Sequence, residues 1–160
     1  MEIKKESIIY PLPSDSLILK KEEFWRVQLP VDYKNFIKVN NGGSPEKKSF
    51  VCNNHSYAVI RFLCILEAPE NIEIGMFDID VTWTQLDERL TDDGDLLGVA
   101  LLPIAVLFAG DFLCLDFRES RSNPKVCVWD HENSAELEPV SHHVADTFAE
   151  FMGMLHNTSI

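Results

Sequence analysis

The segment from Leu29 to Gly43 constrains the fold most, because it carries both a helix start and a helix end. Pro30 suits the first turn of a helix, where the N–H that proline lacks would have no partner. Apolar residues then follow at helical spacing, which predicts one buried face: Tyr33, Phe36 and Ile37. Asn40 to Gly43 supplies residues that tolerate the positive φ of a helix C-cap. The segment therefore predicts a short helix that carries no reactive group.

The rest of the chain predicts further helices and several strands. A helix capped by Ser14 or Asp15 is expected to run to about Arg26, and another, capped by Asp80, to run through Leu90. Ser141 is expected to cap a closing helix of about four turns, with apolar residues from Val144 to Leu155 on one face. The expected strands cover residues 49–51, 57–66, 101–107, 111–117 and 125–129, with a short one at 137–140.

The order of these elements predicts the fold class. Leu107 and Asp111 flank a short Phe108-Ala109-Gly110 connection that is typical of a hairpin. Hairpins favour an antiparallel sheet, and the helices then pack on it. We expect a single α+β domain over residues 1–160, mainly an antiparallel sheet with helices packed on it and a closing C-terminal helix. Residues 1–13 are expected to be peripheral.

The charge of the chain is strongly acidic and uneven. The net charge is −12, and residues 51–160 carry nineteen Asp/Glu against five Lys/Arg. A protein that binds phosphate backbones needs the opposite sign, so direct nucleic-acid binding is disfavoured. An acidic surface attracts basic proteins, although a purely solvated acidic face is also common.

Apolar runs and cysteines indicate where the protein resides. The longest apolar run, Val99 to Gly110, is interrupted by Pro103 and is too short to cross a bilayer. The N-terminus has no apolar core after its lysines, so no signal peptide is predicted and we expect a cytoplasmic protein. The cysteines lack Cys-x-x-Cys spacing and are expected to be buried, reduced thiols: Cys52, Cys64, Cys114 and Cys127.

Motifs for catalysis and cofactor binding are absent from the sequence. There is no Gly-x-Ser-x-Gly, Walker A, Gly-x-Gly-x-x-Gly or His-Glu-x-x-His pattern. The richest polar cluster could in principle bind a divalent metal: Asp111, Asp116, Asp130, His131, Glu132, His142 and His143. The two adjacent histidines are expected in the first turn of a helix, where neighbours point apart, so turn formation is favoured. We predict no catalytic residue, no metal site and no cofactor.

The strongest candidates for partner binding are exposed acidic residues. Asp92, Asp93 and Asp95 form an acidic loop that resembles the start of a calcium loop, but the later EF-hand positions are apolar. Together with Asp130 and Glu132, this loop is the predicted partner-binding site. Among aromatic residues, Trp83 and Trp129 are expected in the core, whereas Phe108 is left open between core and interface.

Several blocks of the sequence resemble the SUKH superfamily, which includes a yeast cell-wall-synthesis regulator and many bacterial immunity proteins. The first block is Leu29-Pro30-x-Asp32-Tyr33-x-x-Phe36-Ile37-x-x-Asn40-Asn41-Gly42-Gly43. Similar blocks are Leu102 to Ala105 with Gly110 to Asp116, Val126 to Glu132, and the helix from Val144 to Leu155. The chain departs from the family pattern at Leu107 and Phe108, where members often have small or polar residues.

The resemblance implies a binding protein without catalytic residues. Its bacterial members act as antidotes to polymorphic toxins, many of which act on nucleic acids, so the implied partner is a cognate toxin domain. An acidic antidote can occlude the basic surface with which such a toxin grips phosphate. Two alternatives remain: an intracellular scaffold or regulator with several weaker partners, and a metal-dependent hydrolase that uses Asp111, Asp116, Asp130 and His131.

Overall fold

A computed structural model describes residues 2–157 and confirms an α+β domain built on one antiparallel sheet. The helices and strands follow in this order: α1 (Asp15–Trp25), α2 (Val31–Asn40), β1 (Ser49–Cys52), β2 (His55–Phe62), α3 (Ile79–Leu86), β3 (Leu101–Leu107), β4 (Phe112–Asp116), β5 (Lys125–Trp129), β6 (Ser141–Ala145) and α4 (Phe148–Met154). Short 3₁₀ turns lie between them: η1 (Lys5–Ser7), η2 (Pro69–Asn71), η3 (Gly75–Phe77), η4 (Asp87–Leu90) and η5 (Phe108–Gly110).

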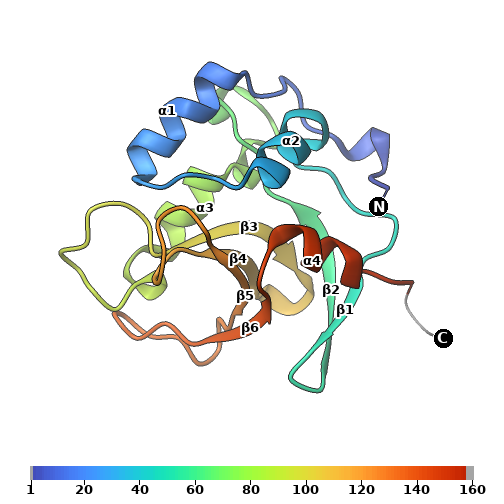
Figure 1. Ribbon diagram of the computed structural model, residues 1–160. Helices are drawn as coiled ribbons and strands as arrows, with labels where there is room; N and C mark the ends of the chain where they lie inside the picture. Colours follow the sequence, from blue (N-terminus) through green and yellow to red (C-terminus); the bar gives the residue numbers. More distant parts are fainter. Residues whose placement is uncertain (1, 158–160) are drawn as a thin grey trace.

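The sheet is a six-stranded meander in which each strand pairs with its neighbour in sequence (Figure 1). The sheet curls, so that its two edge strands approach each other: the Sγ of Cys52 on β1 lies 3.2 Å from the carbonyl oxygen of His143 on β6. The expected hairpin between β3 and β4 is present. Its turn needs positive φ at Ala109 (74°) and Gly110 (98°).

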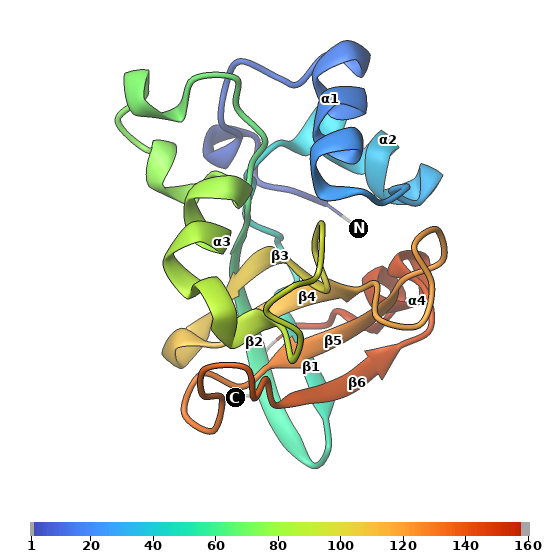
Figure 2. The same cartoon turned by 90° about the vertical axis from the view of Figure 1, so that its left-hand side faces the viewer.

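Helices cover both faces of the curled sheet (Figure 2). The larger core lies on the face toward α1, α2 and α4, where Tyr33, Phe50, Phe62 and Phe148 pack with the inner residues of the strands. On the other face, α3 and η4 cover a smaller cluster around Trp129. The alternation of buried side chains along β4 and β5 supplies both clusters, as expected for a sheet buried on two sides.

The two N-terminal helices begin and end where the sequence predicts. The Ser14 hydroxyl accepts the Leu17 N–H at 3.1 Å, and Arg26 ends α1 in the left-handed conformation. Pro30 precedes the first residue of α2, and Gly42 turns the chain beyond its end with a φ of 70°. Both helices are therefore set by local signals.

The segment before α1 is attached to the core through Asn41. This asparagine is fully buried, and its amide nitrogen donates to the carbonyls of Ile9 and Ile65, both at 3.2 Å. Its amide oxygen accepts the Ile65 N–H at 2.8 Å. Ile9 and Pro13 are buried and Ile3 packs against the core, so the segment expected to be peripheral contributes side chains to the core.

The prediction for the C-terminal region was wrong in its details. Ser141 does not cap a helix: it begins strand β6, and Cys127 and Val128 of β5 pair with His143 and His142. The closing helix is α4, only seven residues long, and Thr147 caps it by accepting the Glu150 N–H at 3.1 Å. Residues 137–140 form no strand, and one isolated bridge joins Ala135 to Glu138.

The third helix also differs from the prediction. Asp78, not Asp80, caps α3 by accepting the Val81 N–H at 3.1 Å. The helix ends at Leu86, after which the chain tightens into η4 up to Leu90.

The four cysteines are free and buried, as expected. No helix in the described part of the chain has both the length and the apolar character needed to cross a membrane.

Candidate functional site

Two acidic segments that are distant in sequence lie side by side. The first contains η4 and the loop that follows it, residues 87–95, and the second is the β5–β6 connection, residues 132–138. The backbone N–H of Leu137 donates to the carbonyl of Glu88 at 3.0 Å, and Gly94 faces the side chain of Leu137. Both segments can be followed at the left and lower left of Figure 1.

These two segments form what we call the acidic surface. It contains eight carboxylates: Asp87, Glu88, Asp92, Asp93, Asp95, Glu132, Glu136 and Glu138. Within residues 2–157, none of the eight forms an ion pair. Glu88 and Glu136 share a side-chain hydrogen bond, and this bond and the charge of Glu136 raise the pKa of Glu88. The surface thus concentrates negative charge, and within the described residues no cationic side chain forms an ion pair with it.

The neighbouring arginine does not neutralise this charge. Arg89 lies within η4, but its Nη2 donates to the carbonyl of His131 at 2.6 Å. Its guanidinium also stacks over the ring of Trp129, 5.0 Å from the centroid. Arg89 therefore joins η4 to the β5–β6 connection and is turned away from the exposed carboxylates.

Asp130 has a different position from the other predicted site residues. Its carboxylate accepts the backbone N–H groups of Glu132 and Asn133 at 3.1 and 3.2 Å, and the Asn133 side-chain amide at 2.8 Å. The side-chain amide of Asn133 contributes most to lowering the pKa of Asp130, and the Asn133 N–H, His142 and the Glu132 N–H add to it. Asp130 thus orders the turn that carries the exposed side chain of Glu132.

A hollow of about 410 Å³, lined by both apolar and acidic residues, opens within the acidic surface. Trp83, Leu90 and Leu97 contribute apolar walls, and the carboxylates of Asp87, Glu88 and Asp93 belong to its lining. Leu97 is 67% exposed. Exposed apolar side chains surrounded by polar groups are typical of protein-binding sites.

The loop around this hollow is anchored at its far end. Gly98 has a φ of 92°, and a Cβ there would lie 2.4 Å from the carbonyl oxygen of Trp25. Only glycine therefore allows this close approach to the end of α1. The next residue, Val99, donates its N–H to the same carbonyl at 3.0 Å. The exposed leucine is thus presented from a loop that is fixed at its base.

The polar cluster singled out in the sequence divides into separate pairs. His131 Nδ1 lies 2.6 Å from Asp111 Oδ1, and His142 Nε2 lies 3.4 Å from Asp130 Oδ2. Asp116 instead pairs with Arg118. In the described part of the chain, no three His, Cys, Asp or Glu side chains are placed together to hold a metal ion. The pairs link neighbouring strands and turns at the end of the sheet.

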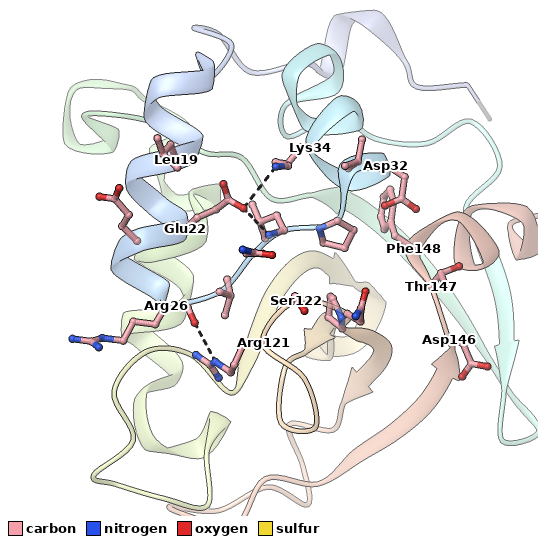
Figure 3. A pocket seen from close by; sticks show the side chains of 18 residues that line it. Leu19, Glu22, Arg26, Asp32, Lys34, Arg121, Ser122, Asp146, Thr147 and Phe148 are labelled. Atoms are coloured by element: carbon pink, nitrogen blue, oxygen red, sulfur yellow. Dashed lines mark hydrogen bonds and ion pairs between the residues drawn. The ribbon is translucent and has the colours of Figure 1, made fainter.

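A larger groove, of about 1050 Å³, was not anticipated from the sequence (Figure 3). It lies between the end of α1, the connection to α2, the β4–β5 loop and the start of α4. Leu19 and Val31 are exposed on its walls, at 56% and 69%. The groove brings together residues from four segments, so no local pattern could predict it.

Several charged groups of the groove already have partners. Glu22 Oε2 accepts the Leu29 N–H at 2.7 Å and lies 3.8 Å from Lys34 Nζ. Arg121 donates to three carbonyls, those of Trp25, Arg26 and Val99. These contacts hold the connection between α1 and α2 against the β4–β5 loop, so Glu22 and Arg121 serve the fold.

The three aromatic residues singled out in the sequence occupy different environments. Trp129 is fully buried, as predicted, and its indole N–H donates to the carbonyl of Arg89 at 2.9 Å. Trp83 is only half-buried, because it contacts the core and also lines the hollow. Phe108 is 72% exposed on the β3–β4 turn, which answers the question that the sequence left open.

Sequence reasoning missed four carboxylates of the acidic surface, Asp87, Glu88, Glu136 and Glu138, and the exposed Leu97 beside them. One signal was present, since the two leucines at 96–97 follow an acidic loop directly and precede a glycine. The contribution of Glu136 depends on contacts between segments about fifty residues apart, which no local pattern contains.

The fold is an α+β domain with a curled antiparallel meander, a short closing helix and an acidic surface at one end. A protein-family model described as SUKH_6, SMI1-KNR4 cell-wall, matches residues 15–152. The chain therefore belongs to the SUKH superfamily. A search of curated proteins and a search of solved structures each found no match.

Proposed function

We propose that this protein is a non-enzymatic, cytoplasmic immunity protein that neutralises a cognate toxin domain by binding it directly. The observation that carries the proposal is the acidic surface, in which eight carboxylates lack ion pairs in the described chain. A toxin domain that acts on nucleic acid needs a basic surface to hold phosphates. The acidic surface has the complementary sign, which favours fast encounter and occlusion of that basic surface.

The chemistry of the surface also supports binding over catalysis. Inhibition by occlusion needs a complementary face and a few anchoring side chains, and Leu97 beside the hollow supplies such an anchor. Four predicted residues remain exposed and are proposed contacts: Asp92, Asp93, Asp95 and Glu132. Asp130 supports them by ordering the turn before Glu132.

The test is growth rescue with toxin domains encoded beside the gene for this protein. Each domain is expressed from an inducible promoter, with and without this protein, and colony formation is measured. We expect one domain to be lethal alone and harmless in the presence of this protein. The pair should also co-purify in equal amounts, with an affinity that falls as salt rises.

Charge reversal identifies the surface in the same assay. Asp92→Lys, Asp95→Lys and Glu132→Lys together should abolish rescue; Asp93 is left intact because its carboxylate accepts the Asp95 N–H. The matched control reverses three exposed carboxylates on another segment, Glu67, Glu70 and Glu73, and gives the same net charge. Equal rescue by both triple variants would remove the acidic surface from the interface.

Another pattern of results would favour a scaffold or regulator. Such a protein would associate with several partners of similar affinity and would rescue growth from none of the neighbouring domains. That outcome would reject the immunity function and leave the family assignment intact.

A further inference from the structure

The hollow of the acidic surface differs from the larger groove in whether its charged side chains already have partners. In the groove, Glu22 and Arg121 are already bonded to neighbouring side-chain or backbone groups. In the hollow, Asp87, Glu88 and Asp93 have no cationic partner in the described chain. Charge complementarity therefore points to the hollow as the place where a cation from outside would bind.

The walls of the hollow restrict what kind of cation fits. Trp83 supplies an aromatic surface, and Leu90 and Leu97 supply aliphatic contacts. A guanidinium ion is planar and weakly hydrated, stacks on aromatic rings and forks onto carboxylates. The methylene groups of the same side chain can lie against leucines while the charge reaches the rim. A lysine ammonium ion would also pair with the carboxylates, but its interaction with the indole ring of Trp83 would be weaker.

We propose that the hollow lined by Trp83, Glu88, Asp93 and Leu97 receives an arginine side chain of the partner protein. This inference rests on the proposed function, since it names the group through which a basic partner would be held. The site is open to solvent at Leu97 and enclosed by Leu90, which is buried. An arginine seated there would be flanked by three carboxylates and would compensate charge that the folded chain leaves unpaired.

The pair formed by Glu88 and Glu136 agrees with this assignment. A side-chain hydrogen bond to Glu136 and the charge of Glu136 raise the pKa of Glu88. A guanidinium beside Glu88 would favour its ionised form. Binding of arginine should therefore lower the pKa of Glu88.

The three tryptophans allow a direct test without a toxin. The indole N–H of Trp25 donates to Asp80 at 2.7 Å and that of Trp129 donates to Arg89, whereas in residues 2–157 Trp83 has no such partner. The probe is Nα-acetyl-L-argininamide, followed through the indole signals in ¹⁵N-labelled protein. We expect a saturable shift of the Trp83 signal, with half-saturation on the order of 10 mM, typical of one weakly held side chain. The signals of Trp25 and Trp129 should stay in place.

Matched ligands and variants decide the outcome. The citrulline analogue has the same shape without the charge and should leave Trp83 unshifted, and the lysine analogue should bind more weakly. The Glu88→Gln, Asp93→Asn double variant should lose the response, whereas Glu70→Gln, Glu73→Gln removes the same charge beyond the other end of α3 and should retain it. A Trp83 signal that does not move, or that moves equally with citrulline, would overturn the inference.

The test is separable from that of the proposed function. If arginine fails to bind while a toxin domain is still neutralised, the hollow is not the arginine site and the immunity function stands. If arginine binds but no neighbouring domain is neutralised, the site stands and its partner belongs to another class of basic protein.

Discussion

The carboxylate of Asp32 accepts the backbone N–H of Ala149 at 2.9 Å, and so joins the first turn of α2 to the first turn of α4 across 117 residues. The other carboxylate oxygen accepts the N–H of Tyr33 at 2.8 Å. One side chain thus satisfies free N–H groups at the starts of two helices. This gives a structural reason for the aspartate in the Leu-Pro-x-Asp-Tyr block.

Replacing this residue should loosen the closing helix. Asp32→Ala removes the bond to Ala149, and we expect the free energy of unfolding to fall by about 1 kcal/mol. Urea denaturation monitored by circular dichroism measures the change. Glu46→Ala is the control, because within residues 2–157 its exposed side chain makes no contact of this kind, and the variant should leave stability unchanged. Equal stability of both variants and the parent would show that the bond contributes nothing.

Removing a buried hydroxyl in α2 should stabilise the fold, in contrast to the loss expected for Asp32→Ala. The Oη of Tyr33 is buried and has no hydrogen-bond partner among residues 2–157, and burial raises the pKa of this phenol well above its usual range. Tyr33→Phe keeps the packing of the ring against Phe148 and removes the unsatisfied group. We expect the free energy of unfolding to rise by up to about 1 kcal/mol. Tyr10→Phe at an exposed ring is the control, and a loss of stability in Tyr33→Phe alone would contradict the argument.

The pair of Asp116 and Arg118 should make stability depend on pH. Burial would raise the pKa of Asp116, but hydrogen bonds and charge from Arg118 outweigh it and lower the pKa. A lowered pKa in the folded state means that this contribution is present above the ordinary value of 3.8, and is lost as pH falls through the folded-state value. Arg118→Gln should therefore cost about 1 kcal/mol at neutral pH and progressively less in acid.

The measurement is the free energy of unfolding in urea at a series of pH values, for the parent and for Arg118→Gln. The two curves should converge as Asp116 becomes protonated in the parent. Lys38→Gln removes a cation whose ion pair with Asp15 is largely exposed, and serves as the control with a smaller effect. Parallel curves throughout the range would mean that Arg118 acts through its bond to Ser141 instead.

Leu97 should separate binding from stability. Because its side chain is 67% exposed, Leu97→Ser should change the free energy of unfolding by no more than about 0.5 kcal/mol. The affinity for the cognate partner should fall by about tenfold or more, since apolar anchors at the centre of an interface contribute most to binding. Calorimetric titration of the partner measures this. Val51→Ser, at a 53% exposed residue on β1, is the control that should leave affinity unchanged.

Elements with local start and stop signals were predicted well. Three features depend on only a few adjacent residues: the helix starts at Ser14 and Pro30 and the hairpin around Gly110. Local sequence patterns were therefore sufficient to predict them. The C-terminal region failed because Val144 and Phe148 fit a helical spacing although a strand ends between them. Pairing with β5 outweighs the local pattern there, and the actual cap lies six residues after Ser141.

The candidate site was predicted only in part for the same reason. The acidic loop at residues 92–95 is visible in the sequence, but its proximity to Glu136 is created by the bond between Leu137 and Glu88. The hollow requires Trp83 and Leu97 to meet around η4. Such contacts arise when α3 packs on the sheet, and no spacing rule anticipates them.

The acidic loop is structurally separate from the packed sheet and helices, which affects how its sequence can vary. The loop at residues 91–98 is fixed at Gly98 and begins after the buried Leu90, so its exposed tip bears little of the packing. Exchanging this tip for that of another family member would alter the charge pattern and the anchor while leaving the meander and its helices in place. Under the proposed function, this segment is the part of the chain whose exchange would change the binding partner while the framework stays constant.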